Sequence, residues 1–143
     1  MRQNNKEKII VYTYGVFDLF HRGHVELLKE AKALGDKLVV GVFSDEVAKS
    51  FKRESIISLA DRIHMVEHCS FVDEVLVQND LAPDNVLEKI KPHILAKGPG
   101  AGWEEGKEAP GEKIMKKIGG KVLMLPYHDG ISTSDIIKRI KEN

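Results

Sequence analysis

Residues 13–24 read TYGVFDLFHRGH, and this stretch decides both the fold and where to look for function. The apolar, β-branched run at residues 9–14 predicts a buried strand. After the stretch, apolar side chains recur at helical spacing as far as Leu34, and Gly35 follows where many helices end. His21 and His24 therefore stand where a strand passes into a helix. A helix N-terminus offers free N–H groups and partial positive charge to an anion.

Outward from this stretch, strand-like and helix-like segments alternate along the chain. Strands are predicted over residues 37–43, 72–77, 93–96 and 121–125, and helices over 58–70, 83–90, 112–118 and 132–140. This alternation predicts one α/β domain with a five-stranded parallel sheet over residues 9–143, after a polar tail at residues 1–8. The unusual loops, at 15–24, 44–57, 97–111 and 126–133, all follow strands, where such sheets bind ligands.

Composition excludes several classes of protein. The chain has 143 residues, with 22 Lys and Arg against 22 Asp and Glu, which argues against binding to nucleic acid or to an acidic membrane surface. A single cysteine, Cys69, excludes an intramolecular disulfide and a thiolate metal cluster. No apolar run has the length of a membrane span, and the polar start does not resemble a signal peptide. We expect a cytoplasmic protein without membrane insertion.

The histidine pair indicates chemistry on a phosphate. Imidazole N–H groups at a helix start donate to phosphate oxygens where charge builds in a transition state. Two other interpretations stay open: surface histidines of a first helical turn, and a zinc site. Zinc needs three or four ligands, and Asp18 is the only other candidate nearby, so no protein-held metal is expected.

The motif GVFDLFHRGH resembles the cytidylyltransferase-like group of nucleotidyltransferases. DGISTSDII at residues 129–137 looks like that family's (R)TxGIST motif, and FVDEV at 71–75 also fits, so the resemblance spans about residues 9–140. It implies a Rossmann-like three-layer fold and a nucleoside triphosphate whose phosphates carry most of the Mg²⁺ coordination. It also implies a phosphorylated small-molecule acceptor, release of pyrophosphate, and a homodimer.

The resemblance also implies roles for particular residues. Catalysis is expected from His21, His24 and Lys52, and acceptor-phosphate binding from Asp45 and Arg62. Nucleotide binding is expected from Gly15, Val16, Phe17, Gly23, Lys97, Gly98, Gly130, Ile131, Ser132 and Thr133. From the residues alone, Ser132 is also a helix N-cap. Asp18 is expected to accept backbone N–H groups in its turn, and Lys49 and Arg53 to be solvated charges of a loop.

Different motifs favour different nucleotide and acceptor substrates. FDLFH and GISTSD resemble phosphocholine-type and glycerol-phosphate cytidylyltransferases, so CTP with a glycerol-3-phosphate-like alcohol is expected first. Tyr127 and Ser70 stand where those enzymes carry arginine, and Lys97-Gly98 resembles adenylyltransferases that act on heptose phosphates. ATP with a heptose phosphate is therefore the alternative. From another class, a nucleotide-binding regulatory module without turnover also remains open.

Overall fold

The computed structural model describes residues 7–98, 103–104, 106–126 and 131–143. In these ranges the five predicted strands are present, each within two residues of its expected bounds. The strands are β1 (Ile10–Gly15), β2 (Lys37–Phe43), β3 (Glu74–Gln78), β4 (Ile94–Lys97) and β5 (Lys121–Met124). The helices are α1 (Arg22–Ala33), α2 (Asp45–Phe51), α3 (Leu59–Glu67), α4 (Asp84–Ile90), α5 (Glu112–Lys117) and α6 (Thr133–Glu142).

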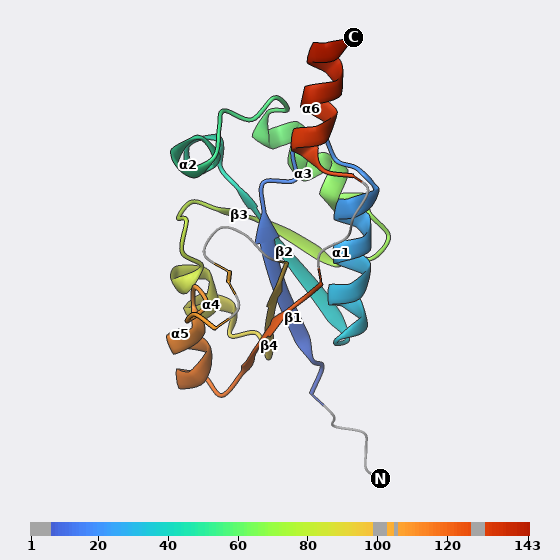
Figure 1. The fold of residues 1–143 in the computed structure, drawn as a ribbon. Helices are drawn as coiled ribbons and strands as arrows, with labels where there is room; N and C mark the ends of the chain where they lie inside the picture. The colour runs from blue at the N-terminus through green and yellow to red at the C-terminus, as the bar shows by residue number, and fades with distance from the viewer. Residues whose placement is uncertain (1–6, 99–102, 105, 127–130) are drawn as a thin grey trace.

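All strand pairs are parallel, and the sheet order is β3-β2-β1-β4-β5. The chain moves from β1 outward to β2 and β3, then crosses back to place β4 on the other side of β1 (Figure 1). The direction of winding therefore reverses beside β1. In open α/β sheets, ligands bind beyond the carboxyl ends of the strands at such a point. The predicted Rossmann-like fold with a parallel five-stranded sheet is confirmed.

Helices cover both faces of the sheet and form two cores. Along β1 the side chains alternate: Val11 packs with Leu28 of α1 and Val66 of α3, whereas Tyr12 packs on the opposite side with residues of α4 and α5. Alternation of this kind is the ordinary consequence of the two-residue period of a strand. This packing fixes the orientation of β1 about its own axis. The strand ends at Gly15, and the chain continues from there to the start of α1.

The segment 44–57, expected to be a loop, contains helix α2. Ser44 begins it, because its hydroxyl oxygen accepts the backbone N–H of Val47 at 3.2 Å. Asp45 and Glu46 lie in the first turn, where negative charge is favourable. The helix has only seven residues, too few to show a clear apolar period. Its consequence for the site is that Lys52, the C-cap of α2, has a defined position.

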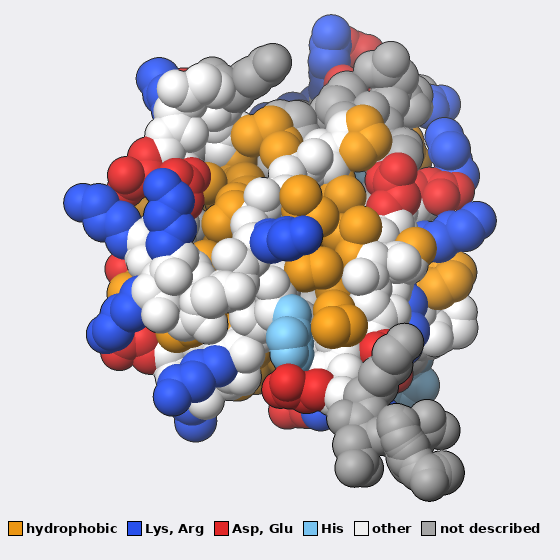
Figure 2. All heavy atoms as spheres, turned by 90° about the horizontal axis from the view of Figure 1, so that it is seen from below, with side chains coloured by type: hydrophobic (Ala, Val, Ile, Leu, Met, Phe, Trp, Pro, Cys, Tyr) orange, Lys and Arg blue, Asp and Glu red, His pale blue; other side chains and the backbone are white. Residues whose placement is uncertain are grey.

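Figure 2 views the molecule from below, toward the end at which β1 begins, and shows hydrophobic side chains in the middle of that face, with Lys or Arg atoms among them and further charged side chains around them. Exposed apolar side chains among the described residues include Leu123 and Met124 of the edge strand β5. Within the described ranges, each helix is too short or too polar to cross a bilayer.

Candidate active site

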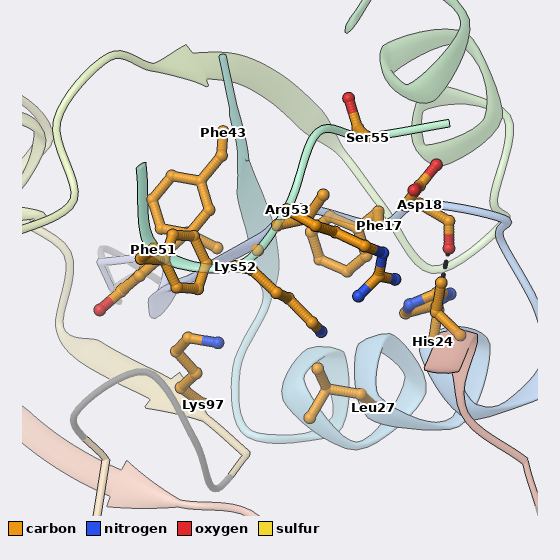
Figure 3. Close-up of a pocket in the computed structure, with 14 residues that line it drawn as sticks. Phe17, Asp18, His24, Leu27, Phe43, Phe51, Lys52, Arg53, Ser55 and Lys97 are labelled. Atoms are coloured by element: carbon orange, nitrogen blue, oxygen red, sulfur yellow. Dashed lines mark hydrogen bonds between the residues drawn. The ribbon is translucent and has the colours of Figure 1, made fainter. Parts of the chain in front are cut away.

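Two adjoining pockets open at the carboxyl ends of β1 and β4. The larger has a volume of about 460 Å³ and the smaller about 260 Å³. Four residues line both: His24, Leu27, Lys52 and Thr133. The two volumes therefore meet at His24 and Lys52, which approach from α1 and from the end of α2 (Figure 3).

The two histidines cap the start of α1 by exchanging backbone hydrogen bonds. The backbone N–H of His21 donates to Nδ1 of His24 at 3.1 Å, and that of Gly23 donates to Nδ1 of His21 at 3.0 Å. A ring nitrogen that accepts a hydrogen bond carries no proton, so each neutral imidazole has its proton on Nε2. Both rings thus present an Nε2–H donor, fixed in tautomer and orientation by the backbone.

His24 is held neutral. Its ring stacks on His21 with centroids 3.8 Å apart and on Phe20 at 5.4 Å. Burial, with smaller contributions from the neighbouring His21 and Lys52, lowers the pKa of His24 to about 3. Burial also lowers the pKa of His21, with a smaller contribution from Arg22. Both side chains are therefore hydrogen-bond donors rather than cations near neutral pH.

Gly23 is required by the same arrangement. A Cβ at this position would lie 2.9 Å from Cε1 and 3.1 Å from Nδ1 of His21, and 3.4 Å from the carbonyl oxygen of Ile131. Any side chain would push the imidazole away from the N–H that orients it. The glycine between the histidines is thus explained by close packing against the ring, not by an unusual φ angle.

The loop between β1 and α1 is held in an uncommon conformation. Phe17 and Leu19 have φ angles of 56° and 49°, a left-handed region that non-glycine residues rarely adopt. The carboxylate of Asp18 fixes the loop by accepting the backbone N–H groups of Ile56 and Ile57 at 2.8 and 2.9 Å. This agrees with the turn-stabilising role expected for Asp18, and it ties the loop to the segment between α2 and α3.

Three cationic side chains surround the larger pocket. Lys52 and Arg53 reach into it from the end of α2, and Lys97 points into it from β4 on the other side (Figure 3). Within the described part of the chain, none of the three has an ion-pair partner. Burial and, to a smaller extent, Lys52 lower the pKa of Lys97 to about 8. Burial and Arg53 lower the pKa of Lys52, and the nearby Asp18 carboxylate partly offsets this. Among the described residues lining this pocket, three cations beside a single carboxylate leave an excess of positive charge that is suited to a polyanion.

Arg53 is a pocket residue that the sequence did not reveal. The expectation of a solvated loop charge is not met, because Arg53 is partly buried and lines the larger pocket. Its Nε atom is buried without a hydrogen-bond partner. A buried donor that bonds to nothing costs free energy, and such atoms are rare unless a ligand satisfies them. We found no sequence signal that separates Arg53 from Lys49, which is exposed on α2.

The start of α6 closes the smaller pocket. Ser132 is the N-cap, since its hydroxyl accepts the N–H of Asp135 at 3.1 Å, and Thr133 donates its hydroxyl to the carbonyl of Asp18 at 2.8 Å. Ile131, Ser132 and Thr133 all line this pocket together with His21, Gly23 and Gly98. The helix N-termini of α1 and α6 thus border one cavity. Gly130 lies outside the described residues.

Asp45 and Arg62 line neither pocket and pair with each other instead. Arg62 is 1% exposed and donates to the carbonyls of Val16, Phe43 and Ile57 as well as to the Asp45 carboxylate at 2.5 Å. The hydrogen bond from Arg62 is the main reason why the pKa of Asp45 is lowered. The geometry gives the pair a positioning role: it holds the ends of β1 and β2 against the α2–α3 segment.

Aromatic side chains form one wall of the larger pocket. Tyr14, Phe43 and Phe51 line it, and Nζ of Lys97 lies 5.1 Å from the centroid of the Tyr14 ring. Trp103 is 1% exposed and donates its indole N–H to the Tyr14 hydroxyl at 2.9 Å. The burial and this hydrogen bond make Trp103 an anchor behind the Tyr14 ring rather than a surface on which a ligand stacks.

The structure thus brings most of the expected site residues together. Those that line the two pockets are Gly15, Val16, Phe17, His21, Gly23, His24, Lys52, Lys97, Gly98, Ile131, Ser132 and Thr133. The expectation did not include the aromatic wall, Leu27, Arg53, Ser55, Pro126 or Ser134, which also contribute.

Comparison with known proteins agrees with this geometry. A family model described as cytidylyltransferase-like matches residues 12–139. The bifunctional protein HldE of Campylobacter concisus (strain 13826) is 41% identical over 144 residues, which cover 99% of this chain and 29% of HldE. HldE of Aliarcobacter butzleri (strain RM4018) is 38% identical over 142 residues, or 98% and 28% of the two chains. The chain spans less than a third of the length of these curated relatives.

Solved structures show the same fold. The lipopolysaccharide core biosynthesis protein from Thermoplasma volcanium GSS1 superposes with a TM-score of 0.74 at 29% sequence identity, covering 86% of this chain and 100% of that chain. A protein from Archaeoglobus fulgidus, with a TM-score of 0.59 and 19% identity, shares the fold alone. Because the family model covers most of the sequence and the HldE relatives align along nearly all of it, this chain belongs to the cytidylyltransferase-like family of nucleotidyltransferases.

Proposed function

We propose that this protein transfers an adenylyl group from ATP to the phosphate of a sugar phosphate, forming a nucleotide sugar and pyrophosphate. The observation that carries the proposal is the junction of the two pockets. There, two oriented Nε2–H donors and three cationic side chains, for which the described residues provide no ion-pair partner, surround a space bordered by two helix N-termini. Such a site stabilises negative charge on phosphate groups.

The proposed step needs no general base. A phosphate oxygen of the acceptor, already anionic near neutral pH, forms a bond to the α-phosphorus of ATP. The bond from that phosphorus to the oxygen bridging to the β-phosphate breaks, and pyrophosphate leaves with the electron pair. His21 and His24 donate to the non-bridging oxygens as charge develops, and Lys52 stabilises both phosphates. Catalysis then consists of positioning and electrostatic stabilisation.

The two pockets suggest how the substrates divide the site. We place the triphosphate in the smaller pocket, because the N-termini of α1 and α6 and the hydroxyl of Ser132 face it. We place the acceptor in the larger pocket, with its phosphate near Lys52 and Arg53 and its sugar along Tyr14 and Phe51. Arg53 would then use its buried Nε–H on the acceptor phosphate, a contact that a guanidinium fork makes well.

Mg²⁺ fits this site only as a partner of the substrate phosphates. Among the described residues lining the pockets, Asp18 is the one carboxylate, and both of its oxygens accept backbone N–H groups. The phosphates would therefore supply most of the ligands, and the ion would neutralise part of their charge. The homodimer rests on the family resemblance alone, and sedimentation velocity tests it.

Two lines of support favour ATP and a sugar phosphate over CTP and a phospho-alcohol. The Lys97-Gly98 pair and Ser70 resemble adenylyltransferases that act on heptose phosphates. The relatives reported above are named HldE, and the structural neighbour is named for biosynthesis of the lipopolysaccharide core, which is a saccharide. The cytidylyltransferase expectation, which rested on FDLFH and GISTSD, takes second place.

The test is pyrophosphate release with Mg²⁺, comparing ATP and CTP against heptose, glycerol, ribitol and choline phosphates. The proposal expects turnover with ATP and a heptose phosphate, abolished in His24→Asn. Turnover with CTP and a phospho-alcohol would refute the proposed substrates and leave the reaction class standing. Nucleotide binding without turnover across the panel would instead favour the regulatory module. Isothermal titration calorimetry with each nucleotide in the absence of acceptor measures binding separately from turnover.

A further inference from the structure

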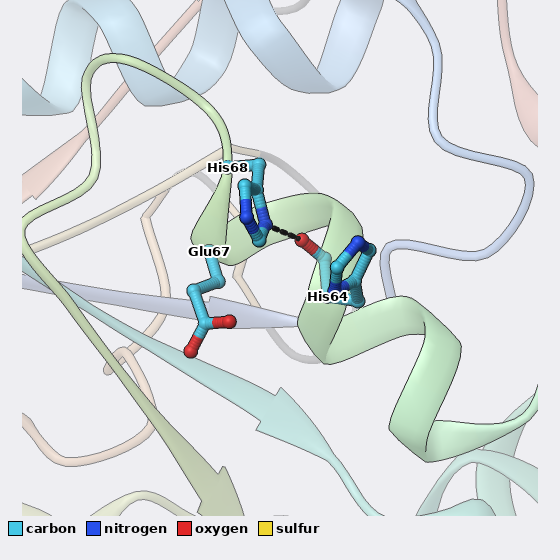
Figure 4. A group of neighbouring side chains, drawn as sticks. All are labelled: His64, Glu67 and His68. Atoms are coloured by element: carbon cyan, nitrogen blue, oxygen red, sulfur yellow. Dashed lines mark hydrogen bonds between the residues drawn. The ribbon is translucent and has the colours of Figure 1, made fainter.

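A second cluster of potential ligands lies on α3, away from the pockets. His64, Glu67 and His68 follow one another at the spacing that brings side chains to one face of a helix, and all three are exposed (Figure 4). One ligand atom from each side chain lies within 4.8 Å of the others. None of the three lines either pocket, so the cluster is separate from the candidate active site.

One of the imidazoles is already oriented as metal ligands usually are. Nδ1 of His68 lies 2.8 Å from the backbone carbonyl oxygen of His64. A carbonyl oxygen only accepts, so Nδ1 must be the donor, and the lone pair of neutral His68 is on Nε2. Metal-bound histidines characteristically donate their other ring nitrogen to a carbonyl or carboxylate, which fixes the tautomer and the ring. The two histidine rings also lie together, with centroids 4.3 Å apart.

We propose that His64, Glu67 and His68 form a surface site for one divalent transition-metal ion of the zinc type. Zinc binds imidazole nitrogen and carboxylate oxygen at about 2.0–2.2 Å, which requires the three ligand atoms to approach by small rotations of exposed side chains. Two imidazoles and one carboxylate suit Zn²⁺, Ni²⁺ or Cu²⁺ better than Mg²⁺ or Ca²⁺. Three protein ligands leave a coordination position for water.

The site has a structural consequence for α3. An ion held by residues 64, 67 and 68 links successive turns at the end of the helix and opposes its fraying. The same helix carries Arg62, which holds the walls of the active site together. Metal binding to the native state is therefore expected to raise the melting temperature, because it adds binding free energy that the unfolded chain lacks.

The experiment titrates the full chain with Zn²⁺ alone, in competition with a chromophoric chelator. The proposal expects one equivalent to bind and the melting temperature to rise by a few degrees. His64→Gln/His68→Gln and Glu67→Gln should each weaken binding at least tenfold, whereas Glu54→Gln, an exposed carboxylate outside the cluster, should not change it. His24→Asn separates this site from the histidines of the pocket and should bind zinc as the wild type does.

Two results would overturn the proposal. One is the absence of saturable binding by the wild-type protein with metal in large excess. The other is unchanged affinity in the double histidine variant, which would place the ion elsewhere. Both outcomes are independent of the proposed function, because pyrophosphate release does not enter the measurement.

Discussion

Acidification is expected to destabilise this protein through His24. Burial, with smaller contributions from His21 and Lys52, holds the pKa of His24 near 3 in the folded state, below its ordinary value of 6.5. Between these two values the unfolded chain binds a proton that the folded chain does not. The free energy of unfolding must therefore fall as the pH is lowered through this window.

The size of the effect follows from the width of the window. Each pH unit below 6.5 removes about 1.4 kcal/mol until the folded-state pKa is reached. At about pH 5 the loss is roughly 2 kcal/mol, a large part of the 5–15 kcal/mol that stabilises a typical domain. Protonation also puts hydrogen on Nδ1, so His24 can no longer accept the N–H of His21 and one of the two capping hydrogen bonds of α1 is lost.

The measurement is urea unfolding of the wild type and of His24→Asn at about pH 7 and about pH 5. The asparagine oxygen replaces Nδ1 as an acceptor and does not titrate, so carboxylates and other histidines cancel in the comparison. The wild type should lose about 2 kcal/mol more than the variant on acidification. An equal loss in both would show that His24 takes up its proton without disturbing the fold, and the reasoning would be wrong.

Four further outcomes are expected, all in the pyrophosphate assay. His24→Ala should lower kcat by about 10²–10³ with an unchanged circular dichroism spectrum. Gly23→Ala should lower kcat by about 10², because its Cβ displaces the neighbouring imidazole, while the melting temperature changes little. Arg53→Ala should raise the KM of the acceptor far more than that of ATP, and Lys49→Ala should change neither. The pKa of Lys97 is about 8, and we propose that its charged form binds a substrate phosphate; kcat/KM should then fall about tenfold per pH unit above 8, and Lys97→Arg should remove that fall.

The sequence predicts the sheet well because its strands are short apolar runs between clear breaks. KLVVGVF at residues 37–43 occupies β2 without error, and Gly35 marks the end of the preceding helix region. The helix α2 was missed because seven residues with two acidic positions give no period to detect. Its N-cap Ser44 was the available signal, and it is ambiguous in a polar stretch.

In the site, the directions in which the arginine side chains point could not be predicted from the sequence. Arg53 follows α2 and Arg62 lies in the first half of α3, and both are charged residues in polar stretches of the sequence. One reaches into the pocket, and the other turns inward to satisfy three carbonyls and a carboxylate. Their different roles follow from the path of the backbone between α2 and α3, which the sequence does not reveal. The histidine pair was predictable because its two residues lie within one helical turn, whereas the arginine roles depend on contacts between residues distant in the chain.

Asp18 joins two segments that border the pockets. Its carboxylate holds the backbone of Ile56 and Ile57, next to Ser55 of the larger pocket, where we propose that the acceptor binds, and its carbonyl holds Thr133 at the start of α6, beside the smaller pocket proposed for the nucleotide. If the backbone at Ile56 and Ile57 moves, Asp18 should move with it and displace the start of α6, and the reverse should also hold. The affinities for the two substrates should consequently be cooperative, and thermodynamic reciprocity requires each substrate to alter the binding of the other by the same factor.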